Sequence, residues 1–358
     1  MRGASALVVL ALVLAGCSDD EPAADPPPAS ATASPDSPTS STPSSESAEP
    51  SPGPTQPPTP AVQGESLPPR TDTPSLANLM REDFDGRGLR VLRTETTTDA
   101  YTRQQVVYSS NGTRVSGVLL RPHGRGPFPA VVLNHGYIEP SIYVTGQGMA
   151  REQDWLARAG FVVLHTDYRG HAAGAPASDR ERELRLAYAR DSINAVLALE
   201  KLPYVDDDRT GMVGRSMGGG VTLNALVAAP GLVDAAVIYA SVSSRYLDNL
   251  NHFTRPNRPE AVSALYAAYG TPQRSPAFYR GLSSRTHFDR ITEPVLVLHG
   301  AVDGTCPPRW SRETQALLRR ADVDSTLVTY PGEDHTFYAR WQDSIVRTVQ
   351  FLRHQFDE

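Results

Sequence analysis

The stretch Val213-Gly214-Arg215-Ser216-Met217-Gly218-Gly219-Gly220 determines how the rest of the chain is interpreted. An apolar run ends at Val213, and apolar residues at helical spacing begin at Val221. Gly-x-Ser-x-Gly between a strand and a helix is typical of a nucleophile elbow, a turn so tight that a Cβ two residues from the serine would strike neighbouring backbone. Such a turn exposes the hydroxyl at the positive end of a helix dipole. We therefore expect Ser216 to be a nucleophile, with a flexible Gly-Ser turn as the alternative.

Strands and helices alternate on both sides of this turn. Continuous apolar runs are typical of parallel strands buried on both faces, and they lie at 130–133, 161–164, 210–213, 235–239 and 295–298. Helical spacing fills the intervals at 149–159, 183–202 and 309–320, and a further strand and helix are expected at 325–330 and 341–356. This order predicts an α/β fold with a mostly parallel sheet and helices on both faces.

Two segments depart from the alternation. Residues 105–109 and 114–120 alternate in polarity around Asn111-Gly112, which predicts a β-hairpin; residues 76–102 before them are ambiguous. Residues 242–290 are rich in aromatic residues and proline and separate two sheet strands. We expect them to form a lid-like excursion over the carboxyl edge of the sheet, where ligands bind in open α/β sheets.

A serine nucleophile needs a base that takes its proton and an acid that orients this base. Asp303 lies in the loop after strand 295–298, and His335 lies in the loop after strand 325–330. Both loops are expected at the same sheet edge as Ser216, in the chain order serine, acid, histidine that this type of fold requires. We therefore predict the triad Ser216, Asp303 and His335.

Two neighbours are alternatives for these roles. His299 could be the base, although its position at a strand end favours hydrogen bonds within its own loop. Asp334 could be the acid, although a residue adjacent to His335 in sequence reaches the imidazole ring poorly. Two N–H donors are also needed for the oxyanion, and the backbone groups of Met217 and Tyr137 are expected to supply them. The Tyr137 hydroxyl is a weaker candidate for an extra donor.

Arg215 has no necessary role in this chemistry. An unpaired buried guanidinium would cost several kcal/mol, so the side chain needs a partner or access to water. We expect Arg215 to pair with an acidic residue, Asp167 or Asp191, and to brace the elbow. The alternative is that it reaches the pocket and attracts an acidic group of the substrate.

The N-terminal part has a different character from the rest. Arg2 and the apolar run 6–14 are typical of a signal peptide, and Leu14-Ala15-Gly16-Cys17 resembles the lipobox of bacterial lipoproteins. The resemblance implies a signal peptide over 1–16, a lipid on Cys17 and a protein held at the extracytoplasmic face of the membrane. Residues 17–75 are rich in proline, serine and threonine, so we expect a disordered tether before a single domain over 76–358.

Charge and cysteine content limit the remaining possibilities. The tether carries most of the acidic excess, and residues 76–358 have a net charge of about +1, which argues against a nucleic-acid partner. The chain has two cysteines, so a lipid on Cys17 would leave Cys306 as a lone thiol. We expect no metal and no cofactor.

Several short motifs together resemble the α/β-hydrolase superfamily, and more narrowly the catalytic domain of the prolyl oligopeptidase family and related acyl esterases. They cover about 105–356 and comprise Asn134-His135-Gly136, Asp167-Tyr168-Arg169-Gly170, Val205-Asp206 with Arg209, Gly214-Arg215-Ser216-Met217-Gly218-Gly219, His299-Gly300 with Asp303, and Tyr330-Pro331-Gly332 with His335. The family's nucleophile, acid and base fall on Ser216, Asp303 and His335.

This resemblance implies an α/β-hydrolase fold and a small-molecule ester or short peptide as substrate. We expect an esterase that forms an acyl-enzyme. The alternatives are a peptidase of the prolyl oligopeptidase type acting on short peptides, and a non-catalytic surface binding module on the same fold.

Overall fold

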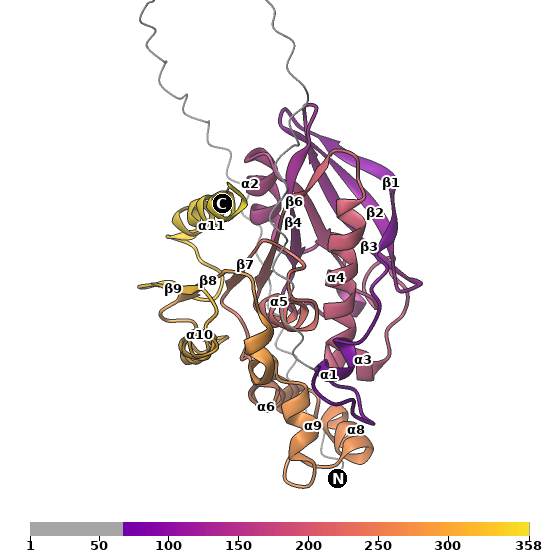
Figure 1. Ribbon diagram of the computed structural model, residues 1–358, viewed down its shortest axis with the longest axis vertical. Coiled ribbons are helices and arrows are strands. Elements are labelled where there is room, and N and C mark those ends of the chain that lie inside the picture. The colour runs from indigo at the N-terminus through magenta and orange to yellow at the C-terminus, as the bar shows by residue number, and fades with distance from the viewer. Residues whose placement is uncertain (1–66, 358) are drawn as a thin grey trace, which may run out of the picture. The chain divides into compact units, whose positions relative to one another are not determined.

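The computed structural model describes residues 67–357, so the expected signal segment 1–16, Cys17 and most of the expected tether lie outside the described residues. Within them lies a nine-stranded mixed sheet with the order β1-β2-β3-β5-β4-β6-β7-β8-β9 (Figure 1). The strands are β1 (Arg87–Thr97), β2 (Tyr101–Ser110), β3 (Thr113–Pro122), β4 (Phe128–Asn134), β5 (Val162–Thr166), β6 (Val205–Arg215), β7 (Ala235–Tyr239), β8 (Val295–Gly300) and β9 (Ser325–Tyr330).

The sheet is parallel from β5 to β9 and antiparallel from β1 to the β3–β5 pair. The central strands β4, β5, β7 and β8 are apolar and fully or almost fully buried, because helices cover both of their faces. The predicted mostly parallel α/β-hydrolase fold is therefore confirmed.

Helices form a layer on each face of this sheet (Figure 1). One core lies under α1 (Leu76–Leu79), α4 (Leu186–Glu200), α5 (Met217–Ala228) and α10 (Arg309–Arg320). The other lies under α2 (Ala150–Arg158) and α11 (Trp341–Asp357). The short helices η1 (Pro140–Ile142) and α3 (Asp179–Leu184) lie in connections after β4 and β5.

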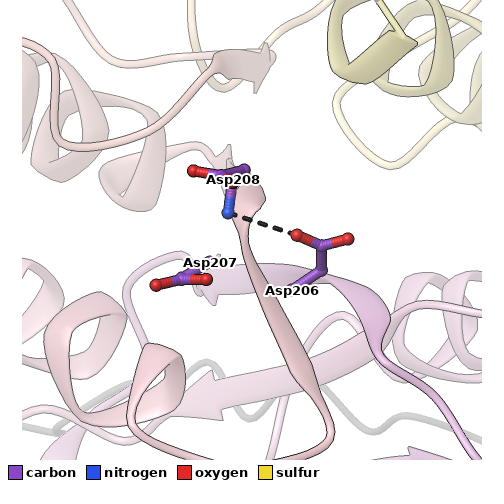
Figure 2. Close-up of side chains that lie close together, drawn as sticks. All are labelled: Asp206, Asp207 and Asp208. Atoms are coloured by element: carbon purple, nitrogen blue, oxygen red, sulfur yellow. Dashed lines mark hydrogen bonds between the residues drawn. The ribbon is translucent and has the colours of Figure 1, made fainter. Parts of the chain in front are cut away.

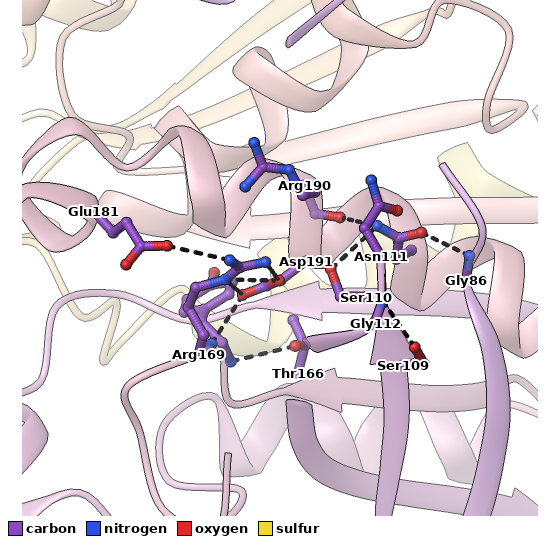
Figure 3. A network of polar contacts seen from close by, with 12 residues as sticks. Gly86, Ser109, Ser110, Asn111, Gly112, Thr166, Arg169, Glu181, Arg190 and Asp191 are labelled. Carbon is purple, nitrogen blue, oxygen red and sulfur yellow. Dashed lines mark hydrogen bonds and ion pairs between the residues drawn. The ribbon is translucent and has the colours of Figure 1, made fainter. Parts of the chain in front are cut away.

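The hairpin prediction is confirmed, and the ambiguous segment before it contains a strand. Asn111 and Gly112 both have positive φ, 47° and 79°, as a two-residue turn of this type requires. Figure 3 shows this turn beside α4 and Gly86, whose N–H donates to Asn194 Oδ1 at 2.6 Å. β1 then pairs with β2 at the sheet edge.

Residues 242–290 form a helical insertion between β7 and β8. Its elements are α6 (Tyr246–Asn249), the π-helix η2 (Leu250–Thr254), α7 (Arg255–Asn257), α8 (Pro259–Tyr269), α9 (Pro276–Gly281) and η3 (Ser284–Arg290). Because β7 ends beside the elbow, the first part of the insertion lies next to Ser216: Phe253 and Asn257 line the same cavity as this serine.

The described part of the chain begins within the expected tether. Leu67 packs against the core, and Ser75 is buried and caps α1 by accepting a hydrogen bond from the Asn78 N–H at 3.2 Å. Residues 67–75, expected to belong to the tether, therefore pack on the folded part. Among the helices of residues 67–357, none has the length and apolar character needed to cross a bilayer.

Candidate active site

The turn between β6 and α5 has the geometry expected of a nucleophile elbow. Ser216 has φ 56° and ψ −118°, a conformation that L-residues rarely adopt. A Cβ on Gly214 would lie 2.3 Å from the Gly218 carbonyl oxygen, and one on Gly218 would lie 1.8 Å from the Asn134 carbonyl oxygen. Neither position can therefore carry a side chain unless the backbone moves. The two glycines allow β6, β4 and α5 to approach closely enough to lift Ser216 above the sheet edge.

The loops after β8 and β9 meet at this edge and join the expected acid to the expected base. Asp303 Oδ2 accepts a hydrogen bond from His335 Nδ1 at 2.8 Å. The other carboxylate oxygen accepts the backbone N–H groups of Thr305 and Cys306, each at 2.8 Å. With Nδ1 bonded to the carboxylate, Nε2 of His335 is the ring nitrogen left for a substrate or nucleophile.

The alternatives for acid and base have other functions in these loops. His299 is buried and contacts Asp303 through Nε2 at 3.1 Å, while its Nδ1 lies 2.5 Å from Ser311 Oγ. Asp334 Oδ1 accepts the backbone N–H groups of Gly304 and His335. Asp334 therefore holds the two loops together, and His299 supports the Asp303 carboxylate from below.

These contacts keep Asp303 ionised. Burial raises the pKa of this carboxyl, but hydrogen bonds from His299 and His335, the charge of His335 and the Cys306 N–H more than offset burial, so the pKa lies well below its ordinary range. A carboxylate is the form that accepts the His335 Nδ1–H and stabilises an imidazolium at that position.

Ser216 and His335 face one cavity of about 550 Å³. Tyr137, Met217 and Val242 also line it. Within the described chain, Ser216 Oγ makes no hydrogen bond to His335. Cys306 Sγ lies 4.0 Å from this oxygen. The hydrogen bond between nucleophile and base often forms only when substrate is bound, so this geometry is compatible with the proposed triad.

The expected oxyanion donors lie on opposite sides of Ser216. Met217 follows it at the start of α5, and the chain at Gly136 passes so close that an added Cβ would lie 3.2 Å from the Ser216 Cβ. Over residues 67–357, neither the Met217 N–H nor the Tyr137 N–H donates an intramolecular hydrogen bond. The Tyr137 hydroxyl, by contrast, is engaged: it donates to Glu139 Oε2 at 2.6 Å.

Arg215 braces the elbow, as expected, but with a different partner. Its guanidinium pairs with the buried carboxylate of Glu152 on α2, donates to the His335 carbonyl oxygen at 3.2 Å, and lies 4.7 Å from the centre of the Tyr239 ring. The pairing predicted with Asp167 or Asp191 is therefore wrong. Arg215 connects the turn that carries the nucleophile to the loop that carries the base.

Both aspartates have partners of their own, and only Asp191, on α4, is on the opposite face of the sheet. Asp191 on α4 pairs with Arg169, whose Nη2 lies 2.7 Å from Asp191 Oδ1 and whose other amino group contacts Glu181 (Figure 3). Asp167 accepts hydrogen bonds from the hydroxyls of Ser116 and Tyr143. α2, rather than α4, packs on the side of the sheet toward which the Arg215 side chain points.

Sequence reasoning missed several residues around the cavity. His299 was expected to bond within its own loop, as it does with Cys306 and Ser311, but its contact with the Asp303 carboxylate had no signal in the sequence. Arg185 and Arg258 line the cavity, although both are far from Ser216 in sequence. Cys306 is fully buried with a free thiol, as expected, but its position beside Ser216 depends on the path of the loop after β8.

An acidic cluster lies at the opposite end of β6. Asp206, Asp207 and Asp208 bring one carboxylate oxygen each to within 4.8 Å of one another, as Figure 2 shows. Asp206 is paired with Arg209 at 2.6 Å, and the other two side chains are exposed. Because β6 is parallel to its neighbours, this cluster lies at the amino edge of the sheet, away from Ser216.

Comparison with known proteins places the chain among hydrolases. The model of the prolyl oligopeptidase family matches residues 148–358. The uncharacterized peptidase YtmA of Bacillus subtilis (strain 168) is 28% identical over 245 residues, which are 68% of this chain and 90% of that protein. Dipeptidyl aminopeptidase BIII of Pseudoxanthomonas mexicana is 27% identical over 218 residues, 59% of this chain and 30% of that protein.

Solved structures share the fold at low sequence identity. Acetyl xylan esterase 1 from Thermoanaerobacterium sp. JW/SL YS485 superposes with a TM-score of 0.59 at 18% identity, over 77% of this chain and 92% of that one. The Pyrococcus horikoshii acylaminoacyl peptidase gives a TM-score of 0.58 at 19% identity, over 73% of this chain and 42% of that one. An esterase and a peptidase thus share this architecture.

Proposed function

The chain belongs to the prolyl oligopeptidase family of serine hydrolases, and on that premise we propose that Ser216, His335 and Asp303 form a catalytic triad that cleaves acyl esters. The observation that carries the proposal is the His335–Asp303 hydrogen bond of 2.8 Å at the rim of the cavity that holds Ser216. An imidazole held by a buried carboxylate, with its second nitrogen free, is the base that a serine hydroxyl requires.

In the proposed reaction, Ser216 Oγ attacks the acyl carbonyl carbon while its proton moves to His335 Nε2. The carbonyl oxygen becomes an oxyanion, which the N–H groups of Met217 and Tyr137 bind. The intermediate then collapses, the bond to the alcohol breaks, and the alcohol leaves with the proton from His335. Water repeats the sequence on the acyl-enzyme and releases the acid. Asp303 remains ionised throughout and orients the imidazole.

We propose an ester as the preferred substrate class because both carboxylates beside the cavity already accept hydrogen bonds from its wall, although only Glu183 is ion-paired. Glu139, which lines the cavity, accepts the Tyr137 hydroxyl, and the adjacent Glu183 is ion-paired with Arg258 at 3.1 Å. The runner-up is a peptidase acting on short peptides. It is favoured by the Bacillus and Pseudoxanthomonas relatives, which are named as a peptidase and a dipeptidyl aminopeptidase.

Two measurements test these alternatives. A fluorophosphonate probe is expected to label the full chain and to fail on Ser216→Ala; absence of labelling of a folded wild-type protein would favour a non-catalytic binding module. A panel of 4-nitrophenyl esters is then compared with proline-containing peptide anilides. The esterase proposal requires the larger kcat/KM for the esters, and a clear preference for the anilides would establish the peptidase instead.

We further propose that the protein works at the extracytoplasmic face of the membrane, held by a lipid on Cys17. The support is the Leu14-Ala15-Gly16-Cys17 sequence after a short apolar run. These residues lie outside the described part of the chain.

A further inference from the structure

The cavity that holds Ser216 contains one arginine without a partner for its charge. Arg185 lies between α3 and α4 and lines this cavity together with Ser216 and His335. Over residues 67–357, its guanidinium makes no ion pair and donates no hydrogen bond. A guanidinium is always charged and has five N–H donors in a planar fork, so this side chain can bind an anion with planar geometry.

The other charged side chains of the wall are bonded to one another, directly or through Tyr137. Arg258 pairs with Glu183 at 3.1 Å and donates to the Tyr137 hydroxyl at 2.7 Å. That hydroxyl in turn donates to Glu139. Neither carboxylate is bonded to Arg185, so this guanidinium has no direct partner, although the two arginines and two glutamates of the wall sum to zero charge.

The backbone adds to this positive charge. Arg185 is the N-cap of α4, a helix of 15 residues with no acidic residue in its first turn and no side-chain cap. The amino end of a helix dipole favours a negative charge and disfavours a cation. An anion beside the first turn of α4 is therefore favoured, whereas the carboxyl end of α3, of which Arg185 is the C-cap, favours the cation itself. Arg185 and the first turn of α4 would then act on the same ligand.

The charge of Arg185 acts on Cys306, a neighbour of the reacting hydroxyl. Burial raises the pKa of the Cys306 thiol to about 12, and the positive charge of Arg185 is among the influences that oppose this rise. Cys306 Sγ lies 4.0 Å from Ser216 Oγ. Because Arg185 and Ser216 line the same cavity, an anionic group held by Arg185 can belong to the molecule whose carbonyl Ser216 attacks.

We propose that Arg185 binds a carboxylate of the substrate, so that this hydrolase prefers substrates with a free carboxylate close to the scissile bond. The inference rests on the proposed triad chemistry and adds the substrate class to it. A carboxylate matches the planar fork of a guanidinium with two parallel hydrogen bonds. The carboxylate can come from the acyl part of a dicarboxylic acid monoester or from the C-terminus of a short peptide.

The first test compares matched substrates. The kcat/KM for the 4-nitrophenyl monoester of glutaric acid is divided by that for 4-nitrophenyl pentanoate, which is neutral and of similar length. Arg185→Gln should lower this ratio about tenfold, because hydrogen bonds to a charged group are lost. Arg180→Gln is the matched control: it removes the same charge from an exposed site five residues earlier, outside this cavity, and should leave the ratio unchanged.

A peptide arm identifies the source of the carboxylate. Alanine tripeptides with free and amidated C-termini are compared in the same way by mass spectrometry. If Arg185→Gln lowers the ratio for the esters, the carboxylate belongs to the acyl group. If Arg185→Gln lowers only the ratio for the peptides, the carboxylate is the peptide C-terminus. The proposal is wrong if neither ratio changes in Arg185→Gln. It is also wrong if Arg180→Gln changes the two ratios as much as Arg185→Gln does.

The second test does not need turnover. Binding of glutarate to the full chain carrying Ser216→Ala is measured by calorimetry. Adding Arg185→Gln should weaken binding at least tenfold, and adding Arg180→Gln should not. If the wild type hydrolyses no substrate but glutarate binding still depends on Arg185, the proposed hydrolysis is refuted and the anion site is supported. If glutarate binds equally well to Ser216→Ala alone and to both double variants, only the anion site is refuted. Thermal melts identify a variant that has not folded.

Discussion

At the scale of single residues, the base of the proposed triad is defined by one hydrogen bond. His335 Nδ1 donates to Asp303, so Nε2 is the nitrogen that can exchange a proton with Ser216. We expect His335→Ala to lower kcat on a 4-nitrophenyl ester by about 10³-fold or more with a much smaller change in KM, because the base acts mainly in the transition state. His299→Ala is the comparison. If His335→Ala kept near-normal turnover and His299→Ala did not, the roles would be exchanged.

The Asp303 carboxylate should also make stability depend on pH. Burial raises its pKa, but hydrogen bonds from His299 and His335 and the charge of His335 lower it more, so the folded protein holds a lower pKa than the unfolded chain, in which it is about 3.9. The stabilisation is therefore complete above about pH 4 and is lost as the pH falls below that value. The free energy of unfolding, measured in urea between pH 2.5 and 7, should fall less steeply at acid pH in Asp303→Asn than in the wild type. An equally steep fall in the variant would mean that other carboxyls produce it.

Arg215 should contribute to stability rather than to substrate choice. Its partner Glu152 is buried, and removing one member of a buried ion pair costs about 3 kcal/mol. Burial raises the pKa of Glu152, but the charge of Arg215 and hydrogen bonds lower it further, so the pair needs ionised Glu152 and its contribution is lost as the pH falls. The contribution is complete above the pKa of Glu152 in the unfolded chain, about 4.3, so Arg215→Met should destabilise the protein more at pH 8 than at pH 3.

The double variant Arg215→Met with Glu152→Gln provides the control for this prediction. It leaves no buried charge, so it should recover part of the lost stability in chemical unfolding at pH 8. The relative rates for neutral and anionic esters should be the same in Arg215→Met as in the wild type. A selective rise in KM for anionic esters would instead place Arg215 in substrate binding.

At the scale of elements, the elbow depends on close contact between three of them. A Cβ on Gly218 would lie 1.8 Å from the Asn134 carbonyl oxygen, which belongs to the backbone of β4 and cannot rotate away. Gly218→Ala should therefore lower the free energy of unfolding by about 3 kcal/mol or more, measured by urea denaturation. Gly281→Ala is the control, because its Cβ would be 3.4 Å from Ser75 Cβ, an ordinary contact. Equal stability of the two variants would contradict this description of the turn.

The helical insertion is connected to the oxyanion loop mainly through Arg258. This residue precedes α8, pairs with Glu183 and donates to the Tyr137 hydroxyl. Arg258→Gln should speed hydrogen exchange in residues 242–270, and exchange in α11, on the other face of the sheet, should not change. If exchange in residues 242–270 were as slow in Arg258→Gln as in the wild type, Arg258 would not be what holds the insertion in place.

The elements that the sequence predicted are those with local signals. β7, α10 and β9 have the expected bounds, since buried strands and amphipathic helices carry their periodicity in consecutive residues. β1 was missed because nearly all of its residues are exposed, so it lacks an apolar face that alternation could reveal. The same limit applies to the site: each triad residue follows a strand, whereas the Arg215–Glu152 pair depends on how α2 packs against β6.

At the scale of the whole molecule, the charge is unevenly distributed along the chain. Residues 18–75 carry nine acidic residues and one basic residue, while the catalytic domain is almost neutral. The family match begins at residue 148, in the domain, and the triad lies entirely within the matched part. The proposed role of the N-terminal region is to determine where the domain works.

The proposed location depends on Cys17, and a single substitution tests it. A diacylated cysteine holds a protein at the membrane through the burial of its acyl chains, whereas one short apolar run that has been cleaved off does not. The wild-type protein, expressed in a bacterium that processes lipoproteins, should enter the detergent phase of a Triton X-114 separation, and Cys17→Ser should enter the aqueous phase. Cys306→Ser is the matched control, because it removes the other thiol and should still partition into detergent. If Cys17→Ser stayed with the membrane, the apolar segment 6–14 would be the anchor, and the protein would carry no lipid at this residue.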